Sequence, residues 1–107
     1  MIVIAEKVKF KGWVCDVVLS TYAVDQSNAL LLLDSDTSER IATATVNLSG
    51  YGVNLKGDLI PIKNYSENEG MLQTLLDAGV IGDPIRTVHT GHTEIPIVKL
   101  LKKEEVA

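Results

Sequence analysis

The sequence predicts an α+β fold: a single domain with one helix packed on a face of a mostly antiparallel sheet of about five or six strands. Three observations lead to this prediction. Strand-like alternation fills most of the chain, only one segment has helical spacing, and polar turn clusters separate the segments. The 107 residues, 46% of them apolar, suffice to bury one core. We expect the domain to span residues 1–101 and a solvated tail to span residues 102–107.

Two strands joined by a short turn at Lys11-Gly12 are predicted at the start of the chain. In the segment from Ile2 to Phe10, apolar residues alternate with lysines. In the next strand, the residues at every second position from Trp13 to Leu19 share the better-buried face. We therefore expect Trp13 to lie in the core and Cys15 to fill the core rather than act as a nucleophile.

Three further strands are predicted in the middle of the chain. The five apolar residues Ala29–Leu33 lie between turn clusters and are too few for a helix, which favours a central strand. The segment Ile41–Leu48 alternates, and this pattern puts Thr45 and its polar neighbours on a wetter face. Pro61 indicates that the segment Leu59–Ile62 is an edge strand or a very short one.

One helix is predicted from about Glu67 to Ala78. Ser66, followed three residues later by Glu69, forms the pattern of a capping box. Apolar residues then recur at helical spacing on one face, which would pack on the sheet, and Gly79 follows where a left-handed cap is wanted.

The chain is predicted to end in two strands, Ile85–His89 and Thr93–Leu101, joined by a turn at Thr90-Gly91. Pro96 lies within the second of these segments. Because proline cannot donate to a neighbouring strand, Pro96 indicates that this strand lies at an edge of the sheet or begins there.

Composition excludes several classes of protein. Ten basic residues against fourteen acidic residues give a net charge of −4, which argues against direct binding of DNA or RNA. The longest apolar run is too short to span a membrane, and the first residues lack the basic start of a signal peptide. A single cysteine cannot form an internal disulfide. We expect a protein of the cytoplasm that lies away from the membrane.

The stretch from Arg86 to Glu94 contains both histidines and one of the two arginines. The planar fork of Arg86 could hold a phosphate or carboxylate, while His89 and His92 could donate to phosphate oxygens or act as an acid or base. Thr90 could complete the set of groups that surround such an anion. The alternative is a hairpin whose wet face carries threonine and histidine without any ligand. No metal site is expected, since strand residues three apart point to opposite faces.

The predicted helix start and the loop before it supply further candidates. Tyr65 and Tyr51 are free to stack on a base, and Asn64 could read the edge of that base. Glu67 and Glu69 neutralise the helix end, so a structural cap is the alternative interpretation. The candidate ligand-binding residues are thus Arg86, His89, Thr90, His92, Asn64, Tyr65 and Tyr51.

Three stretches of the sequence resemble a known family. They are Ala44-Thr45-Val46-Asn47-Leu48, the run from Ile62 through Tyr65-Ser66-Glu67-Asn68-Glu69-Gly70 to Leu72, and Ala78-Gly79-Val80. The family comprises small uncharacterised proteins of bacteriophages, plasmids and integrated elements, and the resemblance covers about Ile41 to Leu101. Its members carry a glycine and an aromatic residue near the last hairpin, where this chain has Gly91-His92.

The resemblance brings no assigned activity, but it implies an accessory protein that blunts host defences. We expect a non-enzymatic binder without a cofactor, and two mechanisms are open. In one, an assembly of identical chains sequesters a nucleotide immune signal. In the other, acidic, tyrosine-bearing loops bind a host defence protein. The alternatives are a small hydrolase that uses His89 or His92 as a base, and a structural module without a ligand.

Overall fold

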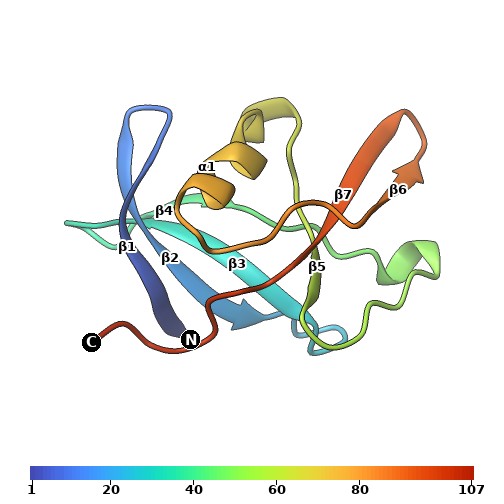
Figure 1. The fold of residues 1–107 in the computed structure, drawn as a ribbon, viewed down its shortest axis with the longest axis horizontal. Coiled ribbons are helices and arrows are strands. Elements are labelled where there is room, and N and C mark those ends of the chain that lie inside the picture. The colour runs from blue at the N-terminus through green and yellow to red at the C-terminus, as the bar shows by residue number, and fades with distance from the viewer.

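The computed structural model describes residues 1–107 and confirms an antiparallel α+β fold with one helix (Figure 1). Its seven strands are divided between a four-stranded and a three-stranded sheet rather than joined in a single one. The elements in chain order are β1 (Ile2–Phe10), β2 (Trp13–Thr21), β3 (Asn28–Asp34), β4 (Arg40–Thr43), the 3-10 helix η1 (Ser49–Tyr51), β5 (Leu59–Pro61), the 3-10 helix η2 (Ser66–Asn68), α1 (Met71–Asp77), β6 (Arg86–Thr90) and β7 (Thr93–Lys99).

The four-stranded sheet has the order β1-β2-β3-β4 and contributes eight of the 17 residues of the main core cluster. The β3 strand lies between β2 and β4, which confirms the predicted central strand. Leu30 and Leu32 on β3 are fully buried, as are Cys15 and Val17 on β2. Cys15 is therefore a core residue, as predicted. Helix α1 adds the buried side chains of Met71 and Leu75 to this same core.

Trp13 does not lie in the core, which corrects the prediction from the strand pattern. It is the first residue of β2 and pairs with Phe10 beside the β1–β2 turn. Its side chain is 49% exposed, whereas Phe10 is 4% exposed. Phe10 and Trp13 lie directly opposite each other, but only Phe10 is covered by the main core cluster.

The predicted strand Ile41–Leu48 is shorter in the structure, because β4 ends at Thr43. Past this point Thr45 forms an isolated antiparallel bridge with Ile62, so the chain crosses here from one sheet toward the other. Thr45 is only 2% exposed, which corrects its placement on a wet face. Its hydroxyl lies 2.8 Å from the Tyr22 hydroxyl and accepts from the Leu30 N–H at 3.3 Å.

The three-stranded sheet has the order β5-β7-β6, so β7 is central and the edge placement predicted from Pro96 is wrong. The Pro96 carbonyl accepts from the Ile62 N–H at 3.0 Å, one residue past the end of β5. The missing N–H of Pro96 therefore falls where the pairing with β5 stops and leaves the pairing with β6 intact. The short edge strand predicted around Pro61 is confirmed as β5.

The predicted helix is shorter than its sequence pattern, and the capping box is absent. Ser66 lies at φ +54° and begins η2, and Gly70, at φ +94°, separates η2 from α1. The N-terminus of α1 is capped from outside by Asn64, whose Oδ1 accepts from the Leu72 N–H at 2.8 Å. Gly79, at φ +71°, follows the helix as predicted.

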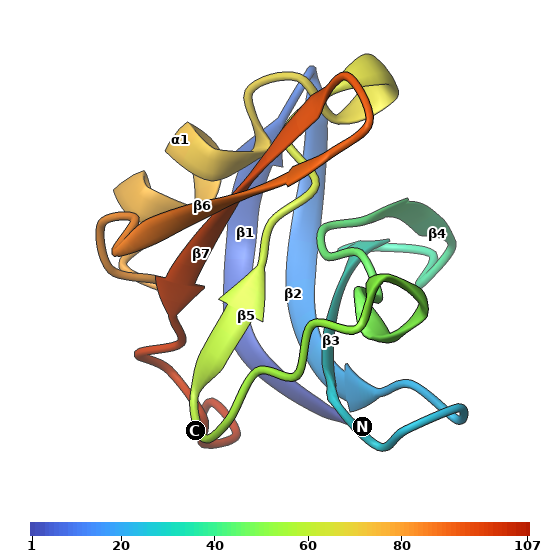
Figure 2. The same cartoon turned by 90° about the vertical axis from the view of Figure 1, so that its right-hand side faces the viewer.

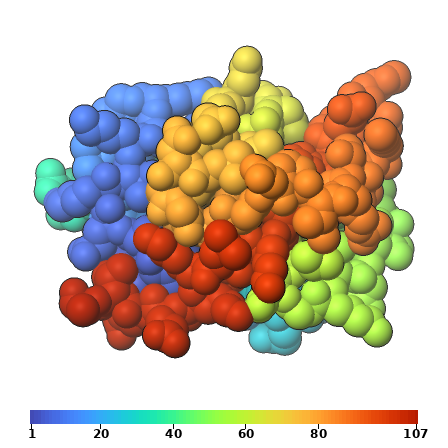
Figure 3. Space-filling view, in the orientation of Figure 1, coloured from blue at the N-terminus to red at the C-terminus, as the bar shows by residue number.

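The C-terminal tail, residues 102–107, is exposed except near Val106. The Val106 N–H donates to the Val3 carbonyl at 2.9 Å, which holds the tail beside β1. Figure 3 shows the tail along one side of the molecule, beneath the first strands. No helix is both long and apolar enough to cross a membrane.

Candidate functional site

The residues predicted on the last hairpin do not gather on one face. Arg86 and His89 both lie on β6, which Figure 2 shows at the front of the molecule. They are three positions apart, so their side chains leave opposite faces of the strand. His89 Nε2 lies 3.7 Å from Glu94 Oε1 across the hairpin, and both side chains are largely exposed. His92 lies in the turn, and Thr90 is half-buried.

Asn64 and Tyr65, predicted to read and stack on a base, are engaged within the fold. The Asn64 Oδ1 atom is occupied by the helix cap described above. Tyr65 is half-buried and packs on a small second cluster formed by Leu48, Ile95 and Ile97. Lys63 Nζ lies 5.5 Å from the centre of the Tyr65 ring, where a cation is attracted to the ring face. Both residues thus have structural roles.

The other candidates are scattered. Tyr51, in η1, is 66% exposed and remains free to meet a partner. Cys15 is fully buried, and burial, followed by the nearby charges of Asp34 and Asp16, raises the pKa of its thiol. No group of three or more histidine, cysteine, aspartate or glutamate side chains could hold a metal ion.

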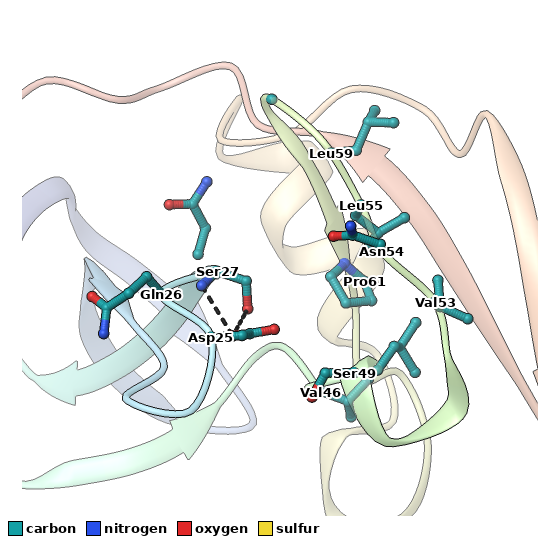
Figure 4. A pocket seen from close by; sticks show the side chains of 13 residues that line it. Asp25, Gln26, Ser27, Val46, Ser49, Val53, Asn54, Leu55, Leu59 and Pro61 are labelled. Atoms are coloured by element: carbon teal, nitrogen blue, oxygen red, sulfur yellow. Dashed lines mark hydrogen bonds between the residues drawn. The ribbon is translucent and has the colours of Figure 1, made fainter.

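The structure instead presents a pocket of about 390 Å³ between two walls (Figure 4). One wall is formed by residues 25–28, the end of the turn between β2 and β3 and the first residue of β3. The other wall is formed by the segment around η1 and the loop that leads into β5. None of the seven residues predicted as ligand contacts lines this pocket. The volume lies within the range of small-molecule sites in proteins.

The polar wall is organised around the carboxylate of Asp25. Its Oδ1 accepts from the Ser27 N–H at 3.1 Å and from the Ser27 hydroxyl at 2.7 Å. The amide of Asn47 donates to the same oxygen at 3.1 Å. These hydrogen bonds, those from Ser27 foremost, lower the pKa of Asp25, so the carboxylate is ionised at neutral pH.

The opposite wall is mainly apolar. Pro61 and five aliphatic side chains line it: Val46, Leu48, Val53, Leu55 and Leu59. All five aliphatic residues belong to, or pack against, the small second cluster beneath the three-stranded sheet. Ser49, Gly57 and Asn54 line the same wall, so apolar and polar groups alternate along it.

Asn47 joins the two walls. Its Nδ2 donates to Asp25, while its Oδ1 accepts from the Ser49 N–H at 2.9 Å at the start of η1. One amide side chain thereby fixes the β2–β3 turn and the η1 segment relative to each other.

The charge of the lining selects among ligands. Asp25 is the one charged residue among the thirteen that line the pocket, and the lining residues Gln26, Asn28 and Asn54 carry neutral amides. An anionic group inside would face a carboxylate without any lysine or arginine to balance it. The arrangement suits a neutral or cationic ligand that donates hydrogen bonds from one edge and presents an apolar surface to the other wall.

Reasoning from the sequence missed this pocket, although a signal was present. Asp25-Gln26-Ser27 and Asn47-Leu48-Ser49 share one pattern, in which an aspartate or asparagine precedes a serine by two positions. In both, the side-chain oxygen accepts from the serine N–H, which is the geometry of an Asx turn. The sequence does not say that the two turns face each other.

Fold and pocket together define a small two-sheet α+β domain with an open cavity, polar on one wall and apolar on the other. No protein-family model, curated protein or solved structure matches this chain.

Proposed function

We propose that this chain is a non-enzymatic binding protein that holds a small ligand in the pocket between the β2–β3 turn and η1. The observation that carries the proposal is the pairing of an ionised Asp25 with a wall of aliphatic side chains across one cavity. Polar groups that converge opposite apolar side chains can orient a ligand and give specificity.

A nucleobase is the ligand class that best fits these two walls. Its amino and ring N–H groups can donate to Asp25, and its flat face can lie against Leu55 and Pro61. The phosphates of a nucleotide would have to extend into solvent, since no cationic side chain lines the cavity. This proposal keeps the expected nucleotide signal but moves its site from the last hairpin to the pocket.

The biological role that we propose rests on the resemblance to proteins of phages and mobile elements. Sequestering a nucleotide that signals infection would lower its free concentration and silence the defence that responds to it. Such a role requires binding alone and no catalytic residue, in keeping with the dispersed positions of Arg86, His89 and His92.

The proposal is tested by NMR titration with adenosine, guanosine, cytidine and their monophosphates. We expect the amide signals of Asp25, Ser27 and Leu55 to shift with at least one of them. Asp25→Asn removes a charge-assisted hydrogen bond and should weaken binding roughly tenfold or more. Asp83→Asn makes the same chemical change at an exposed site outside the pocket and should leave the affinity unchanged.

Two results would contradict the proposal. One is a titration in which no compound shifts the pocket signals. The other is the release of a product from a nucleotide incubated with the protein, provided that His89→Ala abolishes it, because this would favour the small hydrolase instead.

Binding of a host protein is a second candidate, and the exposure of Trp13 favours it. Trp13, 49% exposed, and Val14, 41% exposed, lie beside the β1–β2 turn. Exposed tryptophan is enriched among the residues that dominate binding energy at protein interfaces. A phage-plating assay on defended host cells that express the chain separates the candidates. Loss of counter-defence in Asp25→Asn alone supports the pocket, and loss in Trp13→Ala alone supports a protein partner.

A further inference from the structure

We propose that β6 is a pairing edge through which two copies of this chain associate as antiparallel strands, about a two-fold axis at Val88. The inference concerns a strand that does not line the pocket, and it does not rest on the proposed ligand. It is built from the state of the sheet edges, the direction of the β6 backbone groups, and the residues that symmetry would place opposite one another.

Three of the four sheet edges carry features that hinder the addition of a strand. The pairing of β1 with β2 is interrupted by register shifts between Val3 and Val8, and the tail residue Val106 already binds the Val3 carbonyl. The β4 edge has four residues and a shifted register, and β5 has three residues and ends at Pro61. Short, irregular or proline-bearing edges resist pairing with another chain.

The fourth edge, β6, has none of these features. Its five residues pair with β7 in an unbroken register, and it contains no proline or lysine. Threonine and valine, which make up three of the five, favour strands. Figure 2 shows the strand at the front of the molecule, on the outer side of β7.

The hairpin geometry tells which backbone groups of β6 face outward. Thr90 and Thr93 flank a two-residue turn, so they form the closing hydrogen-bonded pair, and Val88 with Ile95 is the next such pair. The residues between them, Thr87 and His89, direct their N–H and C=O groups away from β7. Pro96, the partner of Thr87, agrees with this pattern because it has no N–H to exchange with β6.

A two-fold axis at Val88 satisfies all of these outward groups at once. It places Thr87 of each copy opposite His89 of the other, and each such pair exchanges two hydrogen bonds. Val88 meets Val88, and Arg86 faces Thr90, so no like charges stand directly opposite each other. A strand pair that is complementary to itself in this way is the requirement of a two-fold interface.

The contact is small, and we expect the dimer to dissociate on dilution. A pair of five-residue strands buries less than the roughly 1,600 Å² of a standard stable interface. Ile85, immediately before β6, is 59% exposed and adds apolar surface at the rim. The resulting assembly leaves the pocket of each copy free of the paired strands, because no β6 residue lines it.

The test compares two variants at one position. His89→Pro removes one outward N–H and keeps the inner pairing of the hairpin, whereas His89→Ala keeps that N–H. In sedimentation experiments over a range of concentrations, the wild type and His89→Ala should rise from one chain of 11.6 kDa toward twice that mass. His89→Pro should remain a single chain.

Amide hydrogen exchange supplies a second measurement that does not depend on a variant. Exchange at Thr87 and His89 should slow as the concentration rises, while the Val88 amide, which faces β7, should be protected throughout. A single-chain mass at every concentration would overturn the proposal and leave the edge to a strand of another protein. An unaltered mass profile in His89→Pro would also overturn it.

Discussion

The two core clusters of this domain differ in size and in what they support. The main cluster of 17 buried residues joins the four-stranded sheet and α1 to Ile60 and Val98 of the three-stranded sheet, whereas the second cluster, which contains Ile95 and Ile97 of β7, has three. The small cluster supports the apolar wall of the proposed pocket and also contacts Val88 of the proposed pairing edge. The region around the main cluster therefore buries most of the apolar core, and the region around the small cluster carries the pocket wall and the pairing edge.

The largest expected effect tests this division directly. Leu30, fully buried on β3, should cost about 2–5 kcal/mol when changed to alanine, because a cavity is left in the main core. Val88→Ala, in the half-buried part of the hairpin, should cost only about 1 kcal/mol. Urea unfolding measures both changes. Equal losses would contradict the division between the two regions.

A smaller effect is expected at the start of α1. Asn64→Ala removes the acceptor for the Leu72 N–H and should cost about 0.5–2 kcal/mol. Ser66→Ala removes a hydroxyl that makes no cap hydrogen bond and should change stability by less than about 0.5 kcal/mol. Thermal or urea unfolding distinguishes them. A larger loss of stability in Ser66→Ala than in Asn64→Ala would support the capping box predicted from the sequence.

The pocket carboxylate should make stability depend on acid. The pKa of Asp25 in the folded protein is below its ordinary value of 3.8, so its stabilising contribution is complete above that value and is lost as the pH falls through the folded pKa. Asp25→Asn should therefore be less stable than the wild type at neutral pH, and the difference should shrink below about pH 4. Asp83→Asn serves as the control, and a difference that persists in strong acid would contradict this origin.

The smallest effect is expected at Arg86. Its side chain is exposed and forms no ion pair, so Arg86→Ala should change stability by less than about 0.5 kcal/mol. Affinity in the pocket should also be unchanged, because Arg86 does not line it. Calorimetric titration with the ligand found by NMR provides the measurement. A large loss of affinity would indicate that the ligand binds at the last hairpin rather than in the pocket.

The strands were the most predictable part of the fold, because period-two alternation depends on a local property of the backbone. The strands β2 and β3 and the burial of Cys15 follow from it. The exposure of Trp13 and the central position of Pro96 depend instead on where each sheet ends relative to its neighbours. Local spacing contains no information about those distances.

The candidate site was the least predictable part. Arginine and histidine in one short stretch attract attention, but β6 sends Arg86 and His89 to opposite faces. The pocket is assembled from turns that are more than twenty residues apart in the sequence and are joined by Asn47. Asn64 illustrates the same difficulty, because its partner Leu72 lies eight positions away, across a glycine that breaks the helical pattern.

The walls of the pocket have a consequence for how this protein can change over evolutionary time. The polar wall and much of the apolar wall are formed by turns and loops, while the main core lies elsewhere. Under the proposed function, substitutions at Gln26, Asn28 or Asn54 would alter ligand preference at little thermodynamic cost to folding. The proposed site could then follow a changing ligand through point mutations while the two sheets remain as they are.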